Sequence, residues 1–504
     1  MNQDLYDPLT KVATGIPGFD ICSEGGLPKG RTTLISGTAG SGKTIFACQF
    51  LKEGIEQGQN GVFVTFEEPP QMLRKNMRGF GWNIQEWENK NQWLFVDASP
   101  VDTVIPVVSG EYDLEPLISR LRYAIQKVNA QRVAMDSISS IFSYVPDVSQ
   151  VRSVLFKLAQ VLREMKVTTV LTSERTTDYG EISRFGIEEF VSDNVVIVRN
   201  ALVGERRRRT IEILKFRGVS HQHGEFPFTI FANKGIVVIP FSTDVSKRQT
   251  SRNRITSGNK DLDIMCGGGW FKGSIILVSG ATGTGKTLMA TEFINGGVRN
   301  GEKCLMFAFE ESRQQLLRNA LGWGVDYEQM EREGKLKIVC RYPEITGLES
   351  HFVTMRDEID RFQPQRVAID SISAMERVST FKGFREFLLT LNTLLKEKGI
   401  TTLCTANTTN LIGSDSITES NISTNTDLII LLRYVEIYGE IKRGLAVLKM
   451  RGSKHNKDIR EFFISEKGML LGQAFRNVIG ILAGNPTYAD VDELDRLGNL
   501  LSET

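Results

Sequence analysis

The sequence lacks the features of an extracellular, membrane-spanning or strongly charged protein. Its six cysteines are scattered over 504 residues without a C-x-x-C pair, so we expect no disulfide framework and a reducing, cytoplasmic compartment. No run approaches the ~20 apolar residues of a membrane span, and residues 1–14 lack the apolar core of a signal peptide. The 61 basic and 60 acidic side chains leave a net charge of +1. This balance excludes an overall basic field for nucleic acid and identifies no partner.

Proline is also scarce. The chain has 14 prolines against 46 glycines, which favours glycine-built turns inside regular structure over proline-rich linkers. A chain of this length is long for one domain, and two domains of about 250 residues are expected.

The sequence contains an internal duplication. Residues 34–44, LISGTAGSGKT, return as LVSGATGTGKT at 277–287, a displacement of 243. The segment RVAMDSIS at 132–139 returns as RVAIDSIS at 366–373, displaced by 234. A longer loop in the first copy, placed near 100–113, accounts for the change. We therefore predict that the same fold occurs twice, in domains 1–241 and 260–504, which are joined by a polar linker at 242–259.

Each copy alternates short β-branched runs with helical spacing. In the first copy the patterns predict helices at 117–129 and 151–166. Strands are predicted at 32–36, 61–65, 93–97, 132–135, 167–172 and 195–198. Strand followed by helix, repeated in this way, predicts an α/β fold in each copy, with helices flanking a mostly parallel sheet.

Both copies carry G-x-x-x-x-G-K-T between an apolar strand and a helical pattern. In such a P-loop the glycine N–H groups wrap phosphates, the lysine reaches the β- and γ-oxygens, and the threonine hydroxyl holds Mg²⁺. A chance glycine-rich turn explains two matches in this context poorly. The phosphate-binding residues are expected to be Gly40, Ser41, Gly42, Lys43, Thr44 and Ile45, and Thr282, Gly283, Thr284, Gly285, Lys286, Thr287 and Leu288.

Acidic residues close the strands that follow each P-loop. Asp136 and Asp370 each end an apolar strand, where a Walker-B acid contacts Mg²⁺ directly or through water. A helix cap is the alternative for an aspartate before a serine at a strand end. Their repetition in the same order favours the metal role.

A second acidic feature is a glutamate pair in each copy, Glu67-Glu68 and Glu310-Glu311, just past the strand that follows the P-loop helix. Such carboxylates can orient or deprotonate a nucleophile that attacks a γ-phosphate, and one of each pair can reach Mg²⁺. The alternative is the solvated first turn of a helix, where acids are favoured by the helix dipole. Their position after the P-loop favours catalysis.

The copies differ at one position of chemical interest. Aligned by 234 residues, Glu189-Phe190 of the first copy stands opposite Ser423-Thr424 of the second. A hydroxyl pair in only one nucleotide-binding copy motivates the hypothesis of a phosphoacceptor. Capping of a strand or loop by Ser and Thr is an equally good interpretation of the residues alone.

Basic residues gather on late segments. The pairs Lys215/Arg217 and Lys449/Arg451 suit phosphate recognition from a neighbouring subunit, as an arginine finger does; a solvated basic strand is the alternative. The block 206–209, four arginines, suits nucleic acid, an acidic neighbour or a subunit junction. Without interleaved aromatics it is weak evidence for DNA. His221 and His223 lack further ligands nearby, so a metal site is not expected there.

Together these segments resemble the KaiC family, the circadian-clock ATPases and autokinases of cyanobacteria, over nearly the whole chain. The matching segments are GTAGSGKT, VTFEE, EEFVSD, ERRRRT, CGGG, GATGTGKT, FEESR and NISTNTD. The resemblance implies RecA-like domains in a double-ring homohexamer, with ATP at the subunit interfaces. It further implies ATP hydrolysis in the first ring, and autophosphorylation with autodephosphorylation in the second.

The resemblance also assigns roles. Glu67, Glu68, Glu310 and Glu311 match catalytic acids, and Ser423 and Thr424 match phosphoacceptors served by ATP across the subunit boundary. Mg²⁺ contacts are expected from Thr44, Thr287, Glu310, Asp136 and Asp370. Further ATP contacts are expected from Lys215, Phe216, Arg217, His221, Trp323, Arg377, Arg443, Lys449, Met450, Arg451, Ser453 and His455.

For partners, the resemblance implies a KaiB-like protein and an output histidine kinase. The short tail at 486–504 has five acids and one arginine, which weighs against KaiA. No membrane partner is expected. A RecA- or DnaB-like DNA motor or recombinase is the alternative function, and a ring scaffold held together by nucleotide is a third; the near-neutral charge disfavours DNA.

Overall fold

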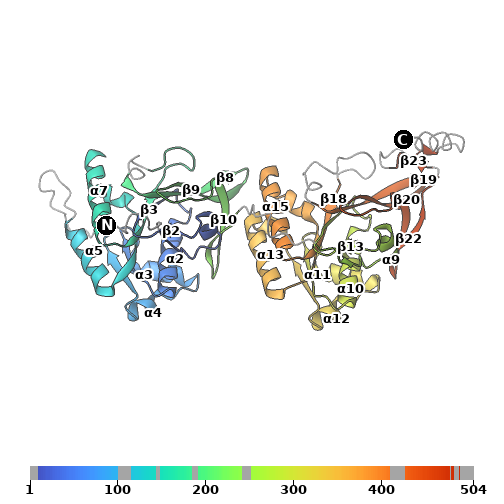
Figure 1. The fold of residues 1–504 in the computed structure, drawn as a ribbon, viewed down its shortest axis with the longest axis horizontal. Coiled ribbons are helices and arrows are strands. Elements are labelled where there is room, and N and C mark those ends of the chain that lie inside the picture. Colours follow the sequence, from blue (N-terminus) through green and yellow to red (C-terminus); the bar gives the residue numbers. More distant parts are fainter. Residues whose placement is uncertain are drawn as a thin grey trace, which may run out of the picture. The chain divides into compact units, whose positions relative to one another are not determined.

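The computed structural model describes residues 10–99, 115–142, 148–183, 191–240, 251–408, 426–476, 478–481 and 487–488. The chain divides into two compact units, Met1–Phe241 and Ser242–Thr504, each built on its own sheet (Figure 1). Each unit is a nine-stranded sheet with helices packed on it.

The first unit orders its main sheet β11-β10-β9-β8-β3-β7-β6-β4-β5. The strands from β8 to β5 are parallel and those from β8 to β11 are antiparallel. A separate two-stranded sheet joins β1 and β2. The strands are β1 Lys11–Val12, β2 Leu27–Pro28, β3 Thr32–Gly37, β4 Asn60–Thr65, β5 Trp93–Asp97, β6 Ala130–Asp136, β7 Thr168–Glu174, β8 Asn194–Val203, β9 Arg206–Phe216, β10 Glu225–Phe231 and β11 Gly235–Val238.

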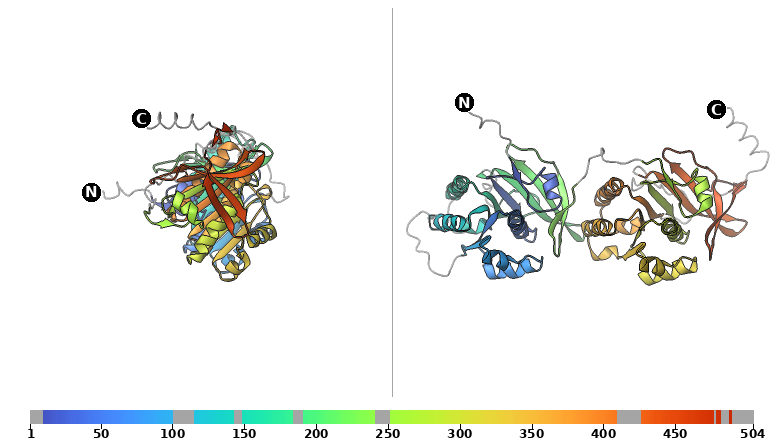
Figure 2. Two further views of the ribbon diagram at one scale, coloured as in Figure 1. Left: turned by 90° about the vertical axis from the view of Figure 1, so that its right-hand side faces the viewer. Right: turned by 60° about the horizontal axis from the view of Figure 1, so that its bottom comes forward.

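Helices cover both faces of this sheet because its central strands are apolar on both sides. Ile35 faces the cluster that contains Phe46 of α2, whereas Leu34 faces the cluster built by α5 and α7. Figure 2 shows the helices on either side of the strands. The helices are α1 Phe19–Cys22, α2 Lys43–Glu56, α3 Pro70–Arg78, α4 Ile84–Asn89, α5 Glu115–Val128, α6 Ser139–Phe142 and α7 Val148–Glu164.

The second unit repeats this strand order, β22-β21-β20-β19-β14-β18-β17-β15-β16 when read from the antiparallel edge. Its strands are β12 Arg254–Ile255, β13 Trp270–Phe271, β14 Ile275–Gly280, β15 Cys304–Ala308, β16 Leu336–Cys340, β17 Arg366–Asp370, β18 Thr401–Asn407, β19 Leu428–Ile437, β20 Glu440–Met450, β21 Arg460–Ser465, β22 Gly468–Ala474, β23 Val478–Ile479 and β24 Thr487–Tyr488. Its helices are α9 Lys260–Met265, α10 Lys286–Arg299, α11 Arg313–Gly322, α12 Tyr327–Arg332, α13 Leu348–Phe362, α14 Ile372–Glu376 and α15 Phe381–Glu397, with a 3-10 turn at Pro343–Ile345.

The predicted α/β class with a mostly parallel sheet is therefore confirmed. The strands expected in the first copy all occur, within two residues at each end except that β8 runs on to Val203, five residues beyond the expected end at 198. The range expected as a linker contains β12, which pairs with β13 of the second unit. The loop expected near 100–113 lies outside the described residues.

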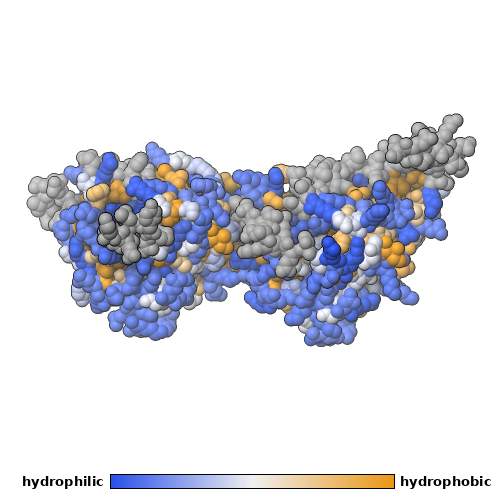
Figure 3. All heavy atoms as spheres, in the orientation of Figure 1, coloured by the Kyte–Doolittle hydropathy of each residue, from blue (hydrophilic) through white to orange (hydrophobic). Residues whose placement is uncertain are grey.

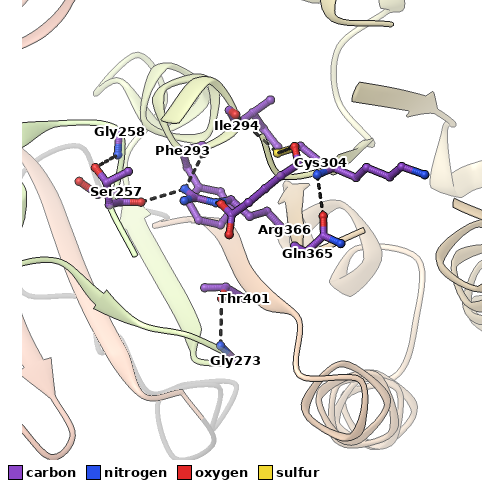
Figure 4. A network of polar contacts seen from close by, with 12 residues as sticks. Ser257, Gly258, Gly273, Phe293, Ile294, Cys304, Gln365, Arg366 and Thr401 are labelled. Atoms are coloured by element: carbon purple, nitrogen blue, oxygen red, sulfur yellow. Dashed lines mark hydrogen bonds and ion pairs between the residues drawn. The ribbon is translucent and has the colours of Figure 1, made fainter. Parts of the chain in front are cut away.

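A buried arginine anchors the start of each unit. Arg366, at the start of β17, donates to the carbonyl oxygens of Thr256 and Phe293 at 2.8 and 3.0 Å, pairs with Glu302, and lies over the Phe293 ring (Figure 4). Its counterpart Arg132 donates to Ala13 and Phe50 in the same way. These donors satisfy backbone groups that are buried away from water, where an unpaired carbonyl is costly. The segment that enters each unit is thus tied to the P-loop helix.

All six cysteines are free thiols, as the scattered spacing predicts. No helix in the described ranges is long and apolar enough to cross a membrane. The face seen in Figure 3 is mainly hydrophilic over both units, with scattered apolar side chains.

One buried position differs in charge between the copies. In α2, Gln49 donates its amide to Gly15 O at 2.8 Å and accepts from Ile236 N at 2.9 Å. In α10 the same place holds Glu292, whose oxygens accept from Met469 N and from Asn259 Nδ2. Burial raises the pKa of Glu292 to about 7.

We predict that Glu292 makes the second unit less stable as pH rises. An unfolded glutamate ionises near pH 4.5, whereas the folded one stays protonated to about pH 7. Stability is therefore fully present below pH 4.5 and is lost between 4.5 and 7, by on the order of 3 kcal/mol. Urea unfolding at pH 5 and pH 8 should show Glu292→Gln clearly more stable than the native chain only at pH 8. Equal pH dependence in both proteins would contradict the assignment.

Candidate nucleotide-binding sites

The two P-loops occupy the same place in their units, between the central parallel strand and the helix that follows it. The loop lies between β3 and α2 in the first unit and between β14 and α10 in the second. Gly42 and Gly285, just before each lysine, have φ of +100° and +106°, a left-handed conformation that glycine adopts without strain. The helix N-terminus therefore opens onto the loop, where backbone N–H groups favour an anion.

The P-loop lysines lie folded over their own loops. Lys43 Nζ donates to Gly37 O and Thr38 O at 2.9 and 3.0 Å. Lys286 Nζ donates to Gly280 O and Ala281 O at 2.9 and 2.7 Å. Burial lowers the pKa of both ammonium groups, and nearby carboxylates oppose that shift. Each lysine is thus a partly desolvated cation at the mouth of the loop.

The strand-end aspartates bind the P-loop threonines. Thr44 Oγ1 donates to Asp136 Oδ2 at 2.6 Å, and Thr172 donates to the other oxygen. Asp370 accepts from Thr287 and Thr405 in the same way, and the peptide bond after each aspartate is cis. Burial raises the pKa of both carboxyl groups. Neither aspartate caps a helix, so the capping alternative is wrong for these side chains.

The first glutamate pair lies in the bend between β4 and α3, before the helix begins at Pro70. Glu67 accepts from the Ser140 hydroxyl. Glu68 accepts from Asn76 Nδ2 at 2.5 Å, and burial, followed by the charge of Asp136, raises its pKa. The two carboxylates therefore have different partners.

The second pair lies in the corresponding bend after β15. Glu310 accepts from Arg377 Nη1 at 3.1 Å and from Asn407 Nδ2 at 3.1 and 3.3 Å. Glu311 accepts from Asn319 Nδ2 at 3.1 Å, and burial, followed by the charge of Asp370, raises its pKa. The capping box of α11 is made by Ser312 with Gln315, so this pair precedes the helix rather than forming its first turn.

Two antiparallel strands bring arginines to the P-loops. Arg209 Nε donates to Gly40 O at 3.3 Å. Its counterpart Arg443 lies over the Tyr434 ring, 5.7 Å from the centroid, and the Tyr434 hydroxyl donates to Thr282 O at 3.4 Å. Trp323, at the end of α11, packs on the core of the second unit.

The other basic residues expected at ATP lie on or shortly after late strands, away from the P-loop of their own unit. In the strand register, Lys215 of β9 lies opposite Val195 of β8, and Val195 lies opposite Leu34 of β3. Leu34 stands three residues before β3 ends at Gly37. Three residues span about 10 Å of strand. Lys449 occupies the same register through Ile429 and Leu277. The structure therefore does not bring these lysines, or the nearby Phe216, Arg217, His221, Met450, Arg451, Ser453 and His455, to the P-loop of the same unit.

The expected phosphoacceptors Ser423 and Thr424, and their counterparts Glu189 and Phe190, lie outside the described residues. His221 and His223 are stacked edge to face with ring centroids 4.8 Å apart. Within the described ranges, no group of three or more His, Cys, Asp or Glu side chains is arranged to hold a metal ion.

Sequence reasoning missed a set of polar residues on β7 and β18. Thr172 and Thr405 bind the aspartates, and Glu174 and Asn407 end the same strands. The available signal was topological, because these strands are parallel neighbours of the P-loop strand and carboxyl ends of parallel strands meet at one edge.

These features define a duplicated P-loop ATPase. The family model described as "ATPase: KaiC" matches residues 12–243 and 255–474. The chain therefore belongs to the KaiC family of circadian-clock ATPases, with the family's nucleotide-binding domain present twice, and the predicted family is confirmed.

Curated relatives extend over nearly the full chain. The chain is 63% identical over 497 residues to circadian clock protein KaiC3 of Synechocystis sp., covering 99% of this chain and 98% of the relative. It is 52% identical over 493 residues to the circadian clock oscillator protein KaiC of Thermosynechococcus vestitus, covering 98% and 95%. For KaiC of Synechococcus elongatus the identity is 50% over 501 residues, covering 99% and 96%.

We predict that Thr405→Val destabilises the second unit. Asp370 is buried, and loss of the Thr405 hydroxyl leaves one of its oxygens without that donor at a cost of about 1–3 kcal/mol. Thr405→Ser keeps the hydroxyl and serves as the control. Urea unfolding of both variants measures the difference. Equal free energies of unfolding for the valine and serine variants would show that this hydrogen bond contributes nothing.

Proposed function

We propose that the chain hydrolyses ATP in its first copy and acts as a serine/threonine autokinase, with autodephosphorylation, in its second. The observation that carries the proposal is the repeated site geometry. In both copies a P-loop lysine, a strand-end aspartate bound to the P-loop threonine, and a glutamate pair converge at one sheet edge. Only the second copy has a serine and threonine, at 423–424, opposite Glu189-Phe190 of the first.

Mg²⁺ fits the donors present. Threonine hydroxyls and carboxylates are the hard oxygen ligands that Mg²⁺ prefers, and phosphate oxygens and water complete its octahedral shell. Thr44 with Asp136, and Thr287 with Asp370, are the proposed protein side of each site, and Glu310 is a further proposed ligand in the second. Bound Mg²⁺ neutralises charge on the β- and γ-phosphates.

For hydrolysis, either of two glutamates in the first copy can act as the base for the attacking water. Glu67 and Glu68 flank the strand edge beside Lys43, and either accepts the proton as water attacks the γ-phosphorus. The bond from the γ-phosphorus to the bridging oxygen breaks, and ADP and phosphate leave. Lys43 places positive charge where negative charge collects on the transferring group.

For autophosphorylation, a hydroxyl of Ser423 or Thr424 takes the place of water. Its oxygen bonds to the γ-phosphorus, ADP leaves with the bridging oxygen, and the proton passes to Glu310 or Glu311. We propose that the ATP belongs to a neighbouring subunit of a homohexamer. The position of Lys215 and Lys449, away from the P-loop of their own unit, supports this, because the family resemblance assigns both lysines to ATP.

The proposed partners follow from the family. A KaiB-like protein is the proposed clock partner and a histidine kinase the proposed output. A DNA-dependent motor is the second candidate, supported by the arginine block 206–209 on β9. Incubation with Mg²⁺-ATP followed by phosphopeptide mapping separates the two. Phosphate on Ser423 or Thr424 supports the autokinase, and its absence together with DNA-stimulated, salt-sensitive hydrolysis supports the motor.

We predict that Glu310→Gln with Glu311→Gln abolishes phosphorylation and leaves most hydrolysis in the first copy. Glutamine keeps the shape of each side chain and removes the base, a change of about 10²–10⁴-fold in proton-transfer catalysis. The matched variant is Glu67→Gln with Glu68→Gln, which should lose most hydrolysis and still become phosphorylated. Loss of both activities in either double variant would contradict separate roles.

A further inference from the structure

The strand beside each P-loop strand ends in a polar residue that differs between the copies. By register Glu174 of β7 lies opposite Gly37, and Asn407 of β18 lies opposite Gly280. Their backbones are held alike, because Glu174 N donates to Ser139 Oγ at 2.9 Å and Asn407 N donates to Ser373 Oγ at 2.9 Å. The two copies therefore place an acid and a neutral amide at the same point beside the nucleotide site.

In the second copy this side chain donates hydrogen bonds to a proposed catalytic acid. Asn407 Nδ2 lies 3.1 and 3.3 Å from the two oxygens of Glu310, and Arg377 Nη1 lies 3.1 Å from one of them. The donors come from different elements, the end of β18 and the end of α14. Two donors converging from separate elements fix a carboxylate more firmly than either alone.

In the first copy the same point adds negative charge. Glu174 is the first of three acids whose charge acts on Lys43, ahead of Asp136 and Glu67. Glu67 is held instead by the hydroxyl of Ser140. A carboxylate at 174 accepts hydrogen bonds only, so it cannot donate to Glu67 as Asn407 donates to Glu310.

The sites consequently differ in charge. Among the described side chains named above, the first site has four carboxylates and one cation, which are Asp136, Glu67, Glu68 and Glu174 with Lys43. The second site has three carboxylates and two cations, which are Asp370, Glu310 and Glu311 with Lys286 and Arg377. Arg209 and Arg443 stand in corresponding places and do not alter the difference.

We propose that Asn407 is a positioning residue of the second site and that, together with Arg377, it fixes the orientation of Glu310. At the same point of the first site, Glu174 gives that site the more negative charge of the two. This inference rests on the proposed role of Glu310 in that site. The amide acts through Glu310 and needs no contact with the nucleotide itself.

The test is ATP turnover at the second site alone. The full chain carries Glu67→Gln and Glu68→Gln to silence the first site, and kcat and KM are measured separately. Asn407→Asp has the size of asparagine but replaces a donor with a charge like that of Glu310, which repels the carboxylate from its position. We expect kcat to fall by at least about tenfold, with KM changing by less than about twofold.

Two further variants keep the outcome interpretable. Asn407→Ala removes the donor without adding charge, and we expect a kcat about tenfold lower with KM little changed. Asn300→Asp makes the same chemical change as Asn407→Asp at an exposed site at the end of α10 and should leave kcat and KM unchanged. Values of kcat for both Asn407→Asp and Asn407→Ala within about twofold of the parent would overturn the proposal.

The first site supplies a reciprocal measurement. In a chain carrying Glu310→Gln and Glu311→Gln, Glu174→Gln removes one negative charge that acts on Lys43. The acidic limb of its pH–rate profile should move to lower pH, and an unchanged limb would contradict the charge difference. These readouts use ATP turnover, so a chain that turns over ATP at the second site without phosphate on Ser423 or Thr424 refutes the autokinase and still tests Asn407.

Discussion

Each unit depends on one constraint, a carboxylate held largely out of water at the end of a central strand, where Asp370 is buried and Asp136 is partly buried. Asp136 and Asp370 remain at that position because two threonine hydroxyls donate to each, one from the P-loop helix and one from the neighbouring strand. These bonds hold three elements at a fixed spacing around the phosphate site. The carboxylate charge is costly to remove from water, and the hydrogen bonds that it accepts align the P-loop with the sheet edge.

Much of the fold was predictable because its causes are local. Apolar runs of strand length, glycines before Lys43 and Lys286, and the duplicated order of motifs led to the α/β class and the P-loops. The partners of each acid were not predictable, because they come from residues distant in sequence. Asn407 lies 97 residues from Glu310, and nothing in either local pattern couples them until the parallel register brings both strand ends together.

The duplication also shows where one fold has been adapted to two chemical environments. Gln49 of the first copy corresponds to Glu292 of the second in the P-loop helix, and Glu174 corresponds to Asn407 beside the nucleotide site, while the strand order is the same. Both are single-residue changes in charge at positions whose backbone is already fixed by the sheet or helix. Such changes alter proton affinity and side-chain orientation without altering the architecture.

The central claim is that both copies are complete phosphate sites. Equilibrium dialysis with Mg²⁺ and a non-hydrolysable ATP analogue tests it most directly, using the native chain, Lys43→Ala, Lys286→Ala and the double variant. The account predicts about two nucleotides per native chain, about one in each single variant and about none in the double variant. One nucleotide per native chain, or two in either single variant, would contradict it.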